Sequence, residues 1–317
     1  MRLVSKSDFR YLAYGLIFAA ACAHTGRRAD ITGRGIPTES ILNLRLIGAY
    51  GPAFDGGISF LDPSGAAING AGEIFISDRG ANAVYGFSPS LDSVSEQGGI
   101  GAAPGTFNRP AGLACDQALN LYVSDSGNRR IQILDRNLRY VKTVDSYFDQ
   151  NDEPLKFTRP EDIKIDREGN FWVADNDKIL KLDPFYELLL EMSYSAPGNF
   201  RIGRVSSIDI SNSDLVAIGD PGNGQVIIAT MHGNHVIDFA VDSPLSVAWD
   251  DRGLLWVAEG NAGKLEVFDV DGNLRYRFSE NTPGYNPSWI TFDSAGRLLV
   301  LESRQRRVFI YEIIRGS

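Results

Sequence analysis

The chain repeats one pattern of residues six times, and this repeat constrains its fold more than any other feature. In each copy a short apolar run ends in an acidic residue, and the six acids are Asp78, Asp125, Asp175, Asp220, Glu259 and Glu302. The residue three positions earlier is large and apolar in most copies: Phe75, Tyr122, Trp172, Ala217, Trp256 and Leu299. A pattern that returns roughly every 40 to 50 residues indicates a series of similar units packed against one another.

Each unit is predicted to contain four short antiparallel strands. In the second unit these are Gly112 to Asp116, Leu121 to Asp125, Arg130 to Leu134, and Leu138 to Val144. Apolar and aromatic residues dominate the strands, and several of the turns begin with Asn or Asp and have Gly three residues later. Phe185 to Met192 stands where a fourth strand is due, so we expect a strand there. Six such units in series predict an all-β protein, a six-bladed β-propeller of four-stranded antiparallel blades.

The two ends of the repeat array are incomplete in complementary ways. The sequence Asn-Leu-Arg-Tyr opens the fourth strand at Asn137 and at Asn273, and a near copy, Asn43 to Leu46, has no three strands before it. The last segment, Val308 to Ile314, is a third strand with no fourth after it. We therefore expect the N-terminal strand to complete the last blade, because closing the ring removes exposed strand edges. Residues 41–317 are predicted to form this one domain.

The best-formed copies resemble the NHL repeat. The resemblance lies in Phe107 to Pro110, Gly112 to Ala114 and Tyr122 to Ile131 of the second unit, and in Phe157 to Asp175 of the third. It extends over residues 41–314 and implies a six-bladed propeller, although a fold alone assigns no function. We interpret the six acids as folding elements that accept hydrogen bonds from nearby backbone N–H groups; a ring of cation ligands is the alternative.

The first 21 residues predict a secretory signal peptide, with basic residues before a short apolar run, Tyr11 to Ala21. Cys22 follows three alanines, which resembles the lipobox of bacterial lipoproteins, although Ala19 stands where leucine is usual. We expect Cys22 to be lipidated and residues 22–40 to form a flexible tether; an ordinary signal peptide with an incidental cysteine is the alternative. Because Ala23 follows the cysteine, the resemblance implies a lipid anchor in the bacterial envelope, at the outer membrane.

The charge of the chain argues against a nucleic-acid partner. The net charge is −9, whereas nucleic-acid binding normally requires a basic face. We expect a monomer that contacts a membrane only through its lipid anchor. The second cysteine, Cys115, lies in an apolar strand pattern and is interpreted as a small buried hydrophobic residue.

Enzymes built on similar six-bladed rings need metal ligands that are scarce in this chain. The amidating lyases that resemble this family hold zinc with histidines from different blades, and the histidines here are His24, His232 and His235. Gluconolactonase-like propellers hold calcium with several oxygen ligands just after the proline that opens the innermost strand, where this chain has one carboxylate, Glu161. We predict no metal, no cofactor and no catalytic residue, with Glu161 and Asp162 as the candidates if the ring is an enzyme.

Three consecutive units place an arginine at the expected mouth of the channel. The residues just before the innermost strands are Asp62, Arg109, Arg159, Arg204, Ser243 and Asn286. The planar guanidinium fork suits carboxylate and phosphate groups, so Arg109, Arg159 and Arg204 are predicted to bind an acidic group, and Asp62 a positive group on the same ligand. Arginines that are solvated, or paired with neighbours such as Glu161 and Asp162, are the alternative.

These observations predict a non-catalytic binding or scaffold module of the bacterial cell envelope. Its partner is expected to be an envelope protein, a peptide or an anionic glycan. The alternative function is an envelope hydrolase or lyase that uses the central channel.

Overall fold

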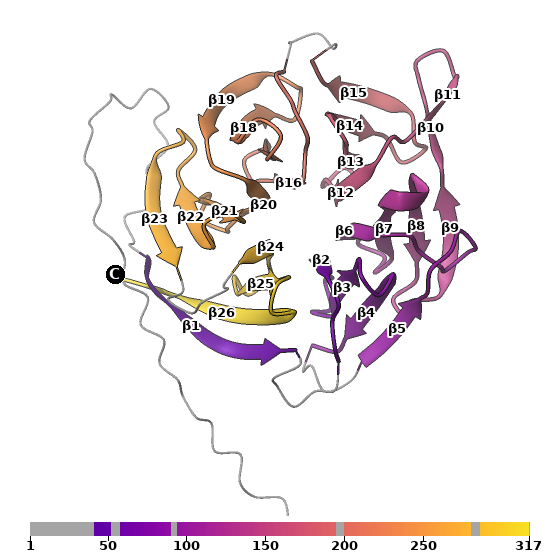
Figure 1. Ribbon diagram of the computed structural model, residues 1–317. Coiled ribbons are helices and arrows are strands. Elements are labelled where there is room, and N and C mark those ends of the chain that lie inside the picture. The colour runs from indigo at the N-terminus through magenta and orange to yellow at the C-terminus, as the bar shows by residue number, and fades with distance from the viewer. Residues whose placement is uncertain (1–40, 52–57, 90–93, 195–199, 280–285, 317) are drawn as a thin grey trace, which may run out of the picture.

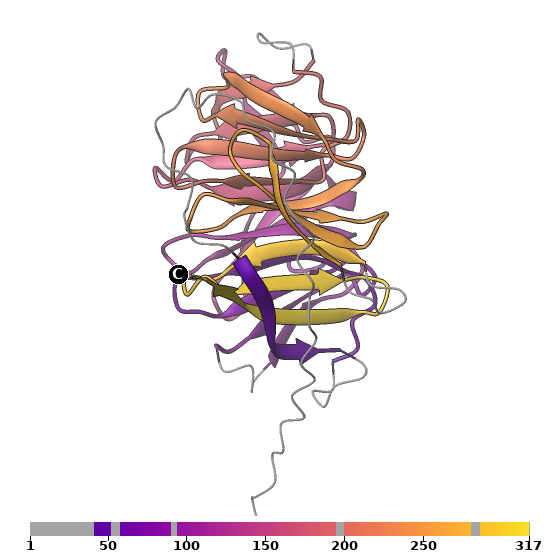
Figure 2. The same ribbon diagram turned by 90° about the vertical axis from the view of Figure 1, so that its left-hand side faces the viewer.

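The computed structural model describes residues 41–51, 58–89, 94–194, 200–279 and 286–316, which form a six-bladed β-propeller (Figure 1). Each blade is a four-stranded antiparallel sheet, and the blades surround a central axis. Figure 2 shows the ring edge-on, with the strands running across its thickness. The structure confirms the predicted all-β ring. Residues 1–40, which include Cys22 and His24, lie outside the described residues.

The strands follow one another in chain order from the axis to the rim in the first five blades. Blade one comprises β2 (Pro63–Ile68), β3 (Ile74–Asp78), β4 (Ala83–Phe87) and β5 (Val94–Gly98). Blade two comprises β6 (Pro110–Cys115), β7 (Leu121–Asp125), the 3-10 helix η1 (Ser126–Asn128), β8 (Arg130–Leu134) and β9 (Tyr140–Val144). Blade three comprises β12 (Pro160–Ile165), β13 (Phe171–Asp175), β14 (Lys178–Leu182) and β15 (Leu188–Met192).

The remaining blades complete the circle. Blade four comprises β16 (Ser207–Ile210), β17 (Leu215–Asp220), β18 (Gln225–Thr230) and β19 (His235–Ala240). Blade five comprises β20 (Pro244–Trp249), β21 (Leu255–Glu259), β22 (Lys264–Phe268) and β23 (Leu274–Ser279). Blade six comprises β24 (Pro287–Phe292), β25 (Leu298–Glu302), β26 (Arg307–Arg315) and, as its outer strand, β1 (Ile41–Tyr50).

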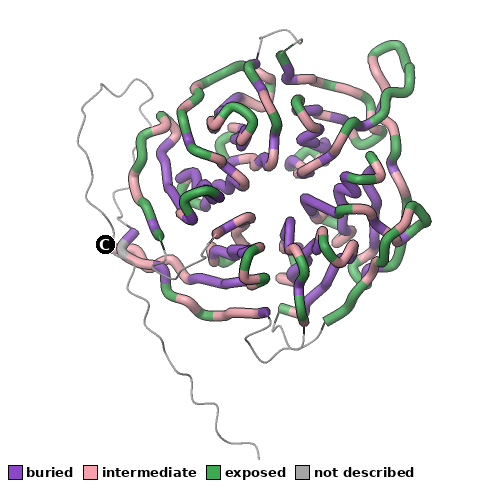
Figure 3. The backbone as a smooth tube through the Cα atoms, viewed as in Figure 1, coloured by how far each residue is buried: buried purple, intermediate pink, exposed green. Residues whose placement is uncertain are grey.

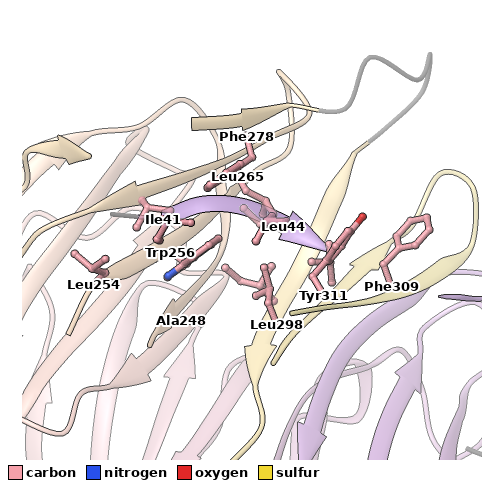
Figure 4. Packing of buried hydrophobic residues seen from close by; sticks show 14 residues of the cluster. Ile41, Leu44, Ala248, Leu254, Trp256, Leu265, Phe278, Leu298, Phe309 and Tyr311 are labelled. Carbon is pink, nitrogen blue, oxygen red and sulfur yellow. The ribbon is translucent and has the colours of Figure 1, made fainter. Parts of the chain in front are cut away.

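The N-terminal strand closes the ring as predicted. β1 pairs antiparallel with β26, from Ile41 opposite Arg315 to Tyr50 opposite Val308. Ile41 and Leu44 are each 2% exposed and pack with Trp256 and Phe278 of blade five and with Tyr311 of blade six (Figure 4). The closing strand therefore joins two blades as well as completing one of them.

The turns between the first and second strands use the aspartate chemistry expected from the sequence. In blade three, Asp166 Oδ1 accepts hydrogen bonds from the N–H groups of Glu168 and Asn170, at 3.0 and 2.9 Å. Gly169 has a φ of 85°, a left-handed conformation that suits glycine. In blade two, Leu119 takes the corresponding left-handed position with a φ of 66°.

Three local features differ from the expectation or were not predicted. β9 begins at Tyr140 rather than Leu138, because Leu138 lies in a left-handed turn with its side chain buried. β15 begins at Leu188, and Phe185 is exposed in the preceding turn. A hairpin of β10 (Ser146–Phe148) and β11 (Pro154–Lys156) stands at the rim between blades two and three (Figure 1).

The core lies between adjacent blades, and the rim strands are the most exposed part of the ring (Figure 3). Residue Trp172, predicted to pack between units, is fully buried among residues of blades three and four. Trp256 has the same role between blades five and six. No helix among the described residues is long and apolar enough to cross a bilayer.

Antiparallel pairing gives the ring two distinct faces. At one face the innermost strand of each blade begins and its second strand ends, so that Pro63 lies opposite Asp78 and Pro160 opposite Asp175. We call this the mouth face. The turns that join first to second strands, and third to fourth strands, lie at the other face, which we call the far face.

Candidate functional site

The six acids at the ends of the second strands are buried, and those of blades one to four fix the loops of the mouth face. Asp78 accepts hydrogen bonds from the N–H groups of Leu61 and Asp62, at 2.6 and 2.8 Å. It also accepts from Gly80 and Ala81, at 2.9 Å each. One buried carboxylate thus holds both the loop before the innermost strand and the turn after the second strand. These contacts support the interpretation of the acids as folding elements.

The same contact positions two of the predicted arginines. Asp175 accepts from the N–H groups of Thr158 and Arg159, and Asp220 accepts from the N–H groups of Gly203 and Arg204. The backbone at each of these arginines is therefore fixed by the acid of its own blade, while the side chain remains available to the mouth. In sequence the acid and the residue it holds are 16 positions apart.

Between blades two and three the mouth face has a hollow of about 360 Å³. We call it the arginine hollow, and its lining residues are Arg109, Ser126, Gly127, Arg129, Thr158 and Arg159. Two of the predicted residues, Arg109 and Arg159, therefore come together. The predicted Arg204 and Asp62 lie on the same face but outside the hollow, with Arg204 exposed before blade four and Asp62 half-buried before blade one.

Arg129 is a lining residue that the sequence reasoning did not identify. It ends the turn after Asp125, and its backbone is left-handed, with a φ of 56°. Its position, four residues after the acid of the second strand, is a signal that it belongs to the mouth face. The repeat motif Tyr122 to Ile131 contains Arg129 but does not by itself indicate a binding role.

The three arginines of the hollow differ in their ionic partners. Arg159 Nε lies 2.5 Å from Glu161 Oε1, so the predicted alternative of local pairing holds for this residue. Arg109 and Arg129 are exposed, and within the described part of the chain no ion pair joins either to a carboxylate. The hollow is therefore lined by three arginines, of which Arg159 alone is paired with a carboxylate among the described residues.

The loops around the channel at the mouth face carry more arginines than carboxylates, although the chain has a net charge of −9. The described residues just before the innermost strands and between the second and third strands are 58–62, 79–82, 107–109, 126–129, 157–159, 176–177, 200–204, 221–224, 241–243, 260–263, 286 and 303–306. Their charged residues are Arg79, Arg109, Arg129, Arg159, Arg201, Arg204, Arg304 and Arg306 against Asp62, Asp177 and Asp242. The six buried acids of this face and the acidic segment 145–156 at the rim offset part of this excess, so the positive charge is local to the arginines around the channel.

The far face has the opposite balance. The carboxylates of its described turns are Glu73, Asp116, Asp135, Asp166, Glu168, Asp183, Glu187, Asp214, Asp250, Asp251, Asp269, Asp271 and Asp293. The arginines of the same turns are Arg136, Arg139, Arg167, Arg252 and Arg297. The turns of the far face are therefore more acidic than the loops around the mouth of the channel.

Polar side chains in the channel link neighbouring innermost strands. Asp162 is fully buried, and its Oδ2 accepts from the Ile208 N–H at 2.9 Å and lies 3.2 Å from the Ser207 hydroxyl. Ser207 and Ser246 continue the pattern, since their hydroxyls accept from the N–H groups of Val247 and Ile290. In blades four, five and six, a backbone N–H of the innermost strand is thus satisfied by a side chain of the preceding blade.

Asp162 and its neighbour Asp209 are carboxylates whose pKa values are raised by burial. Burial raises the pKa of Asp162 to about 6, against the opposing effect of Lys164 and two backbone donors. The Lys164 ammonium lies 3.9 Å from Asp162 Oδ2 and 5.5 Å from the ring centroid of Trp289, on the opposite blade. Both oxygens of Asp162 are engaged, because Oδ1 accepts from the Ile163 N–H.

The other candidate ligands and nucleophiles stand apart from the mouth. His235 Nε2 lies 2.9 Å from Asp238 Oδ1 on the outer strand of blade four, and His232 is in the preceding turn. Across the described ranges, no group of three or more His, Cys, Asp or Glu side chains is placed to hold a metal ion. Cys115, predicted to be buried, is partly buried against the core cluster of blades one and two, and burial raises the pKa of its thiol to about 12.

Comparison with known proteins supports the repeat and the fold. Residues 107–134, which include the first three strands of blade two, match the NHL repeat. No curated protein matches the chain. The chain thus contains an NHL repeat within a six-bladed β-propeller.

Solved structures of similar shape include two lyases and a lactonase. A streptogramin B lyase is 13% identical, with a TM-score of 0.62, over 87% of this chain and 100% of that chain. The virginiamycin B lyase of Staphylococcus aureus is 12% identical, with a TM-score of 0.62, over 86% and 100%. A gluconolactonase of Xanthomonas campestris is 17% identical, with a TM-score of 0.62, over 89% and 99%. Likeness at these identities shows the fold alone.

Proposed function

We propose that the protein is a non-catalytic binding module of the bacterial cell envelope, and that it holds an anionic group of a protein, peptide or glycan in the arginine hollow. The observation that carries this proposal is the convergence of Arg109, Arg129 and Arg159 on one hollow of about 360 Å³. Guanidinium groups form bidentate, charge-assisted hydrogen bonds with carboxylate and phosphate. A concave site with several such groups is suited to an anion.

The surroundings of the hollow favour selective rather than general anion binding. Arginines gather in the loops around the mouth of the channel, whereas the turns of the far face carry an excess of carboxylates. An anion is therefore attracted to one side of the ring and repelled from the other. In this proposal Arg204 and Asp62 contact parts of a larger ligand that extend beyond the hollow.

The envelope location belongs to the same proposal and rests on the sequence. It assigns residues 1–21 to a signal peptide, Cys22 to lipidation and residues 22–40 to the tether, with the anchor in the outer membrane. Secretion and anchoring would bring the mouth face into contact with envelope components.

The alternative, a hydrolase or lyase that uses the channel, requires an available acid or base. Glu161 is paired with Arg159, and both oxygens of Asp162 accept hydrogen bonds from backbone groups. The proposal therefore assigns no catalytic residue.

The test is equilibrium binding of two defined anionic probes, a short polyglutamate peptide and polygalacturonate. Wild-type protein should bind at least one of them, with an affinity that falls as salt is added. The double variant Arg109→Ala/Arg129→Ala should bind at least about tenfold more weakly, since each lost contact contributes on the order of 1–3 kcal/mol.

The matched control is Arg79→Ala/Arg201→Ala, which removes the same charge from the same face outside the hollow. This control should retain most of the binding. Equal affinity of the wild type and both variants would contradict the proposal.

A further inference from the structure

The arginine hollow has a surplus of positive charge that indicates the charge of its ligand. Arg159 is neutralised by Glu161 at 2.5 Å, whereas Arg109 and Arg129 remain without an ionic partner in the described structure. A carboxylate group would compensate one of these two charges. A phosphate monoester carries about −1.5 to −2 at neutral pH and would compensate both.

The buried acids beneath the hollow do not remove this surplus. Asp125 is paired with Arg130, whose Nε lies 2.7 Å from Asp125 Oδ2. Asp175 accepts from the N–H groups of Thr158 and Arg159, and Lys178 lies close enough to act on it electrostatically. The negative charge of each of these carboxylates is therefore compensated by groups of its own blade.

The hollow also presents donors from several directions. Arg109 precedes β6, Arg129 precedes β8, and Arg159 precedes β12, so the guanidinium groups come from three separate segments of two blades. The hydroxyl-bearing residues Ser126 and Thr158 line the same space. A phosphoryl group has three terminal oxygens that accept hydrogen bonds, whereas a carboxylate has two oxygens in one plane.

The segments that carry the donors are fixed before any ligand binds. Gly127 N–H donates to the Asn108 carbonyl at 2.8 Å, and a β-carbon at Gly127 would lie 2.6 Å from both the Asn108 side chain and its carbonyl oxygen. Asn128 Nδ2 donates to Asp125 Oδ2 at 2.9 Å and to the Gly101 carbonyl at 2.8 Å. Such a pre-ordered backbone lowers the conformational-entropy cost of binding a ligand.

We infer that the ligand of the arginine hollow carries a dianionic phosphate monoester rather than a lone carboxylate. This inference rests on the proposed function and specifies its chemistry. The hollow of about 360 Å³ has room for the phosphoryl group and for part of the molecule that bears it.

The experiment compares three probes of similar size: phenyl phosphate, phenyl sulfate and benzoate. Isothermal titration calorimetry of the full chain at pH 7.5 should give phenyl phosphate at least about tenfold higher affinity than either monoanion, a difference of about 1.4 kcal/mol. Arg109→Ala and Arg129→Ala should each abolish this preference. Arg201→Ala, on the same face outside the hollow, should preserve it.

A second set of titrations at pH 5 tests the charge argument directly. Phenyl phosphate loses its second charge as the pH falls below about 6, so its affinity should approach that of phenyl sulfate. The titratable groups around the hollow are Glu161, Asp125, Asp175 and Asp177. Phenyl sulfate keeps the same charge throughout, so a change in its affinity measures the effect of pH on the protein rather than on the probe.

The outcomes separate this inference from the proposed function. Equal affinity for the three probes at pH 7.5, or binding of polyglutamate or polygalacturonate but of none of the three, would overturn the phosphate inference and leave anion binding intact. Binding of no probe and no polyanion would overturn both. Inorganic phosphate serves as a fourth probe: affinity equal to that of phenyl phosphate supports the phosphoryl chemistry with the free ion as ligand, and weaker affinity supports an ester.

Discussion

Leu44→Ala tests how strongly the closing strand contributes to the stability of the ring. Leu44 is 2% exposed on β1, and it packs in one cluster with Trp256 and Phe278 of blade five and Tyr311 of blade six (Figure 4). Truncating a fully buried leucine to alanine costs about 2–5 kcal/mol, because apolar contacts are lost and a cavity remains. We expect about 3 kcal/mol, in the middle of that range, because an outer strand can relax partly towards the cavity.

The assay is urea unfolding followed by far-UV circular dichroism, which reports on all six blades. The neighbouring substitution Arg45→Ala is the control, because Arg45 lies on the opposite side of the strand in an exposed ion pair with Glu312. Exposed pairs contribute about 0–1 kcal/mol, so the control should unfold close to the wild type. Deletion of Ile41 to Ile47 should destabilise the ring more than Leu44→Ala, because it also leaves the outer edge of β26 unpaired.

Equal free energies of unfolding for Leu44→Ala and Arg45→Ala would contradict this prediction. An unchanged unfolding curve after deletion of Ile41 to Ile47 would contradict it as well. Either result would mean that the ring is stable without the contacts made by β1.

Three further predictions concern other parts of the chain. The pKa of Asp162 is raised to about 6 from an ordinary 3.8, so this group stabilises the fold below pH 4, and the stabilisation is lost as the pH rises through 6. The free energy of unfolding of Asp162→Asn, measured relative to wild type in urea titrations, should therefore rise by about 3 kcal/mol between pH 4 and pH 7.5. A difference that does not change with pH would refute the raised pKa. Asp78→Ala removes the acceptor of four backbone N–H groups and should destabilise the protein by at least about 3 kcal/mol in the same assay. The control Asp62→Ala, at a half-buried site next to Asp78, should lower the free energy of unfolding by less than about 1 kcal/mol. Labelled fatty acid should enter the wild-type protein but not Cys22→Ser in a bacterial host, and equal labelling of both would contradict lipidation.

The sequence predicted the ring because the fold repeats and the repeat is visible. The acids that end the second strands occur in every unit, and the displaced copy at Asn43 identified the strand that closes blade six. The hairpin of β10 and β11 escaped prediction because it occurs once, between two blades, and is anchored by burial of Tyr147 and Phe157 rather than by a periodic pattern.

The site was harder to predict, because it is formed between units rather than within one. Arg204 occupies the sequence position equivalent to Arg109 and Arg159, yet the hollow lies between blades two and three and does not include it. Arg129 was missed because its contribution depends on a left-handed backbone, which is uncommon for a residue other than glycine. Equivalent positions in a repeat can therefore have different neighbours and different roles.

The pairing of Ile41 with Arg315 brings the two ends of the last blade together. β26 begins beside Glu302 at the mouth face and ends at the far face, so Ile41 and Arg315 both lie at the far face. A coupling group attached directly beside either residue, as on a sensor chip, would therefore hold the ring by its far face and leave the arginine hollow open to ligands in solution.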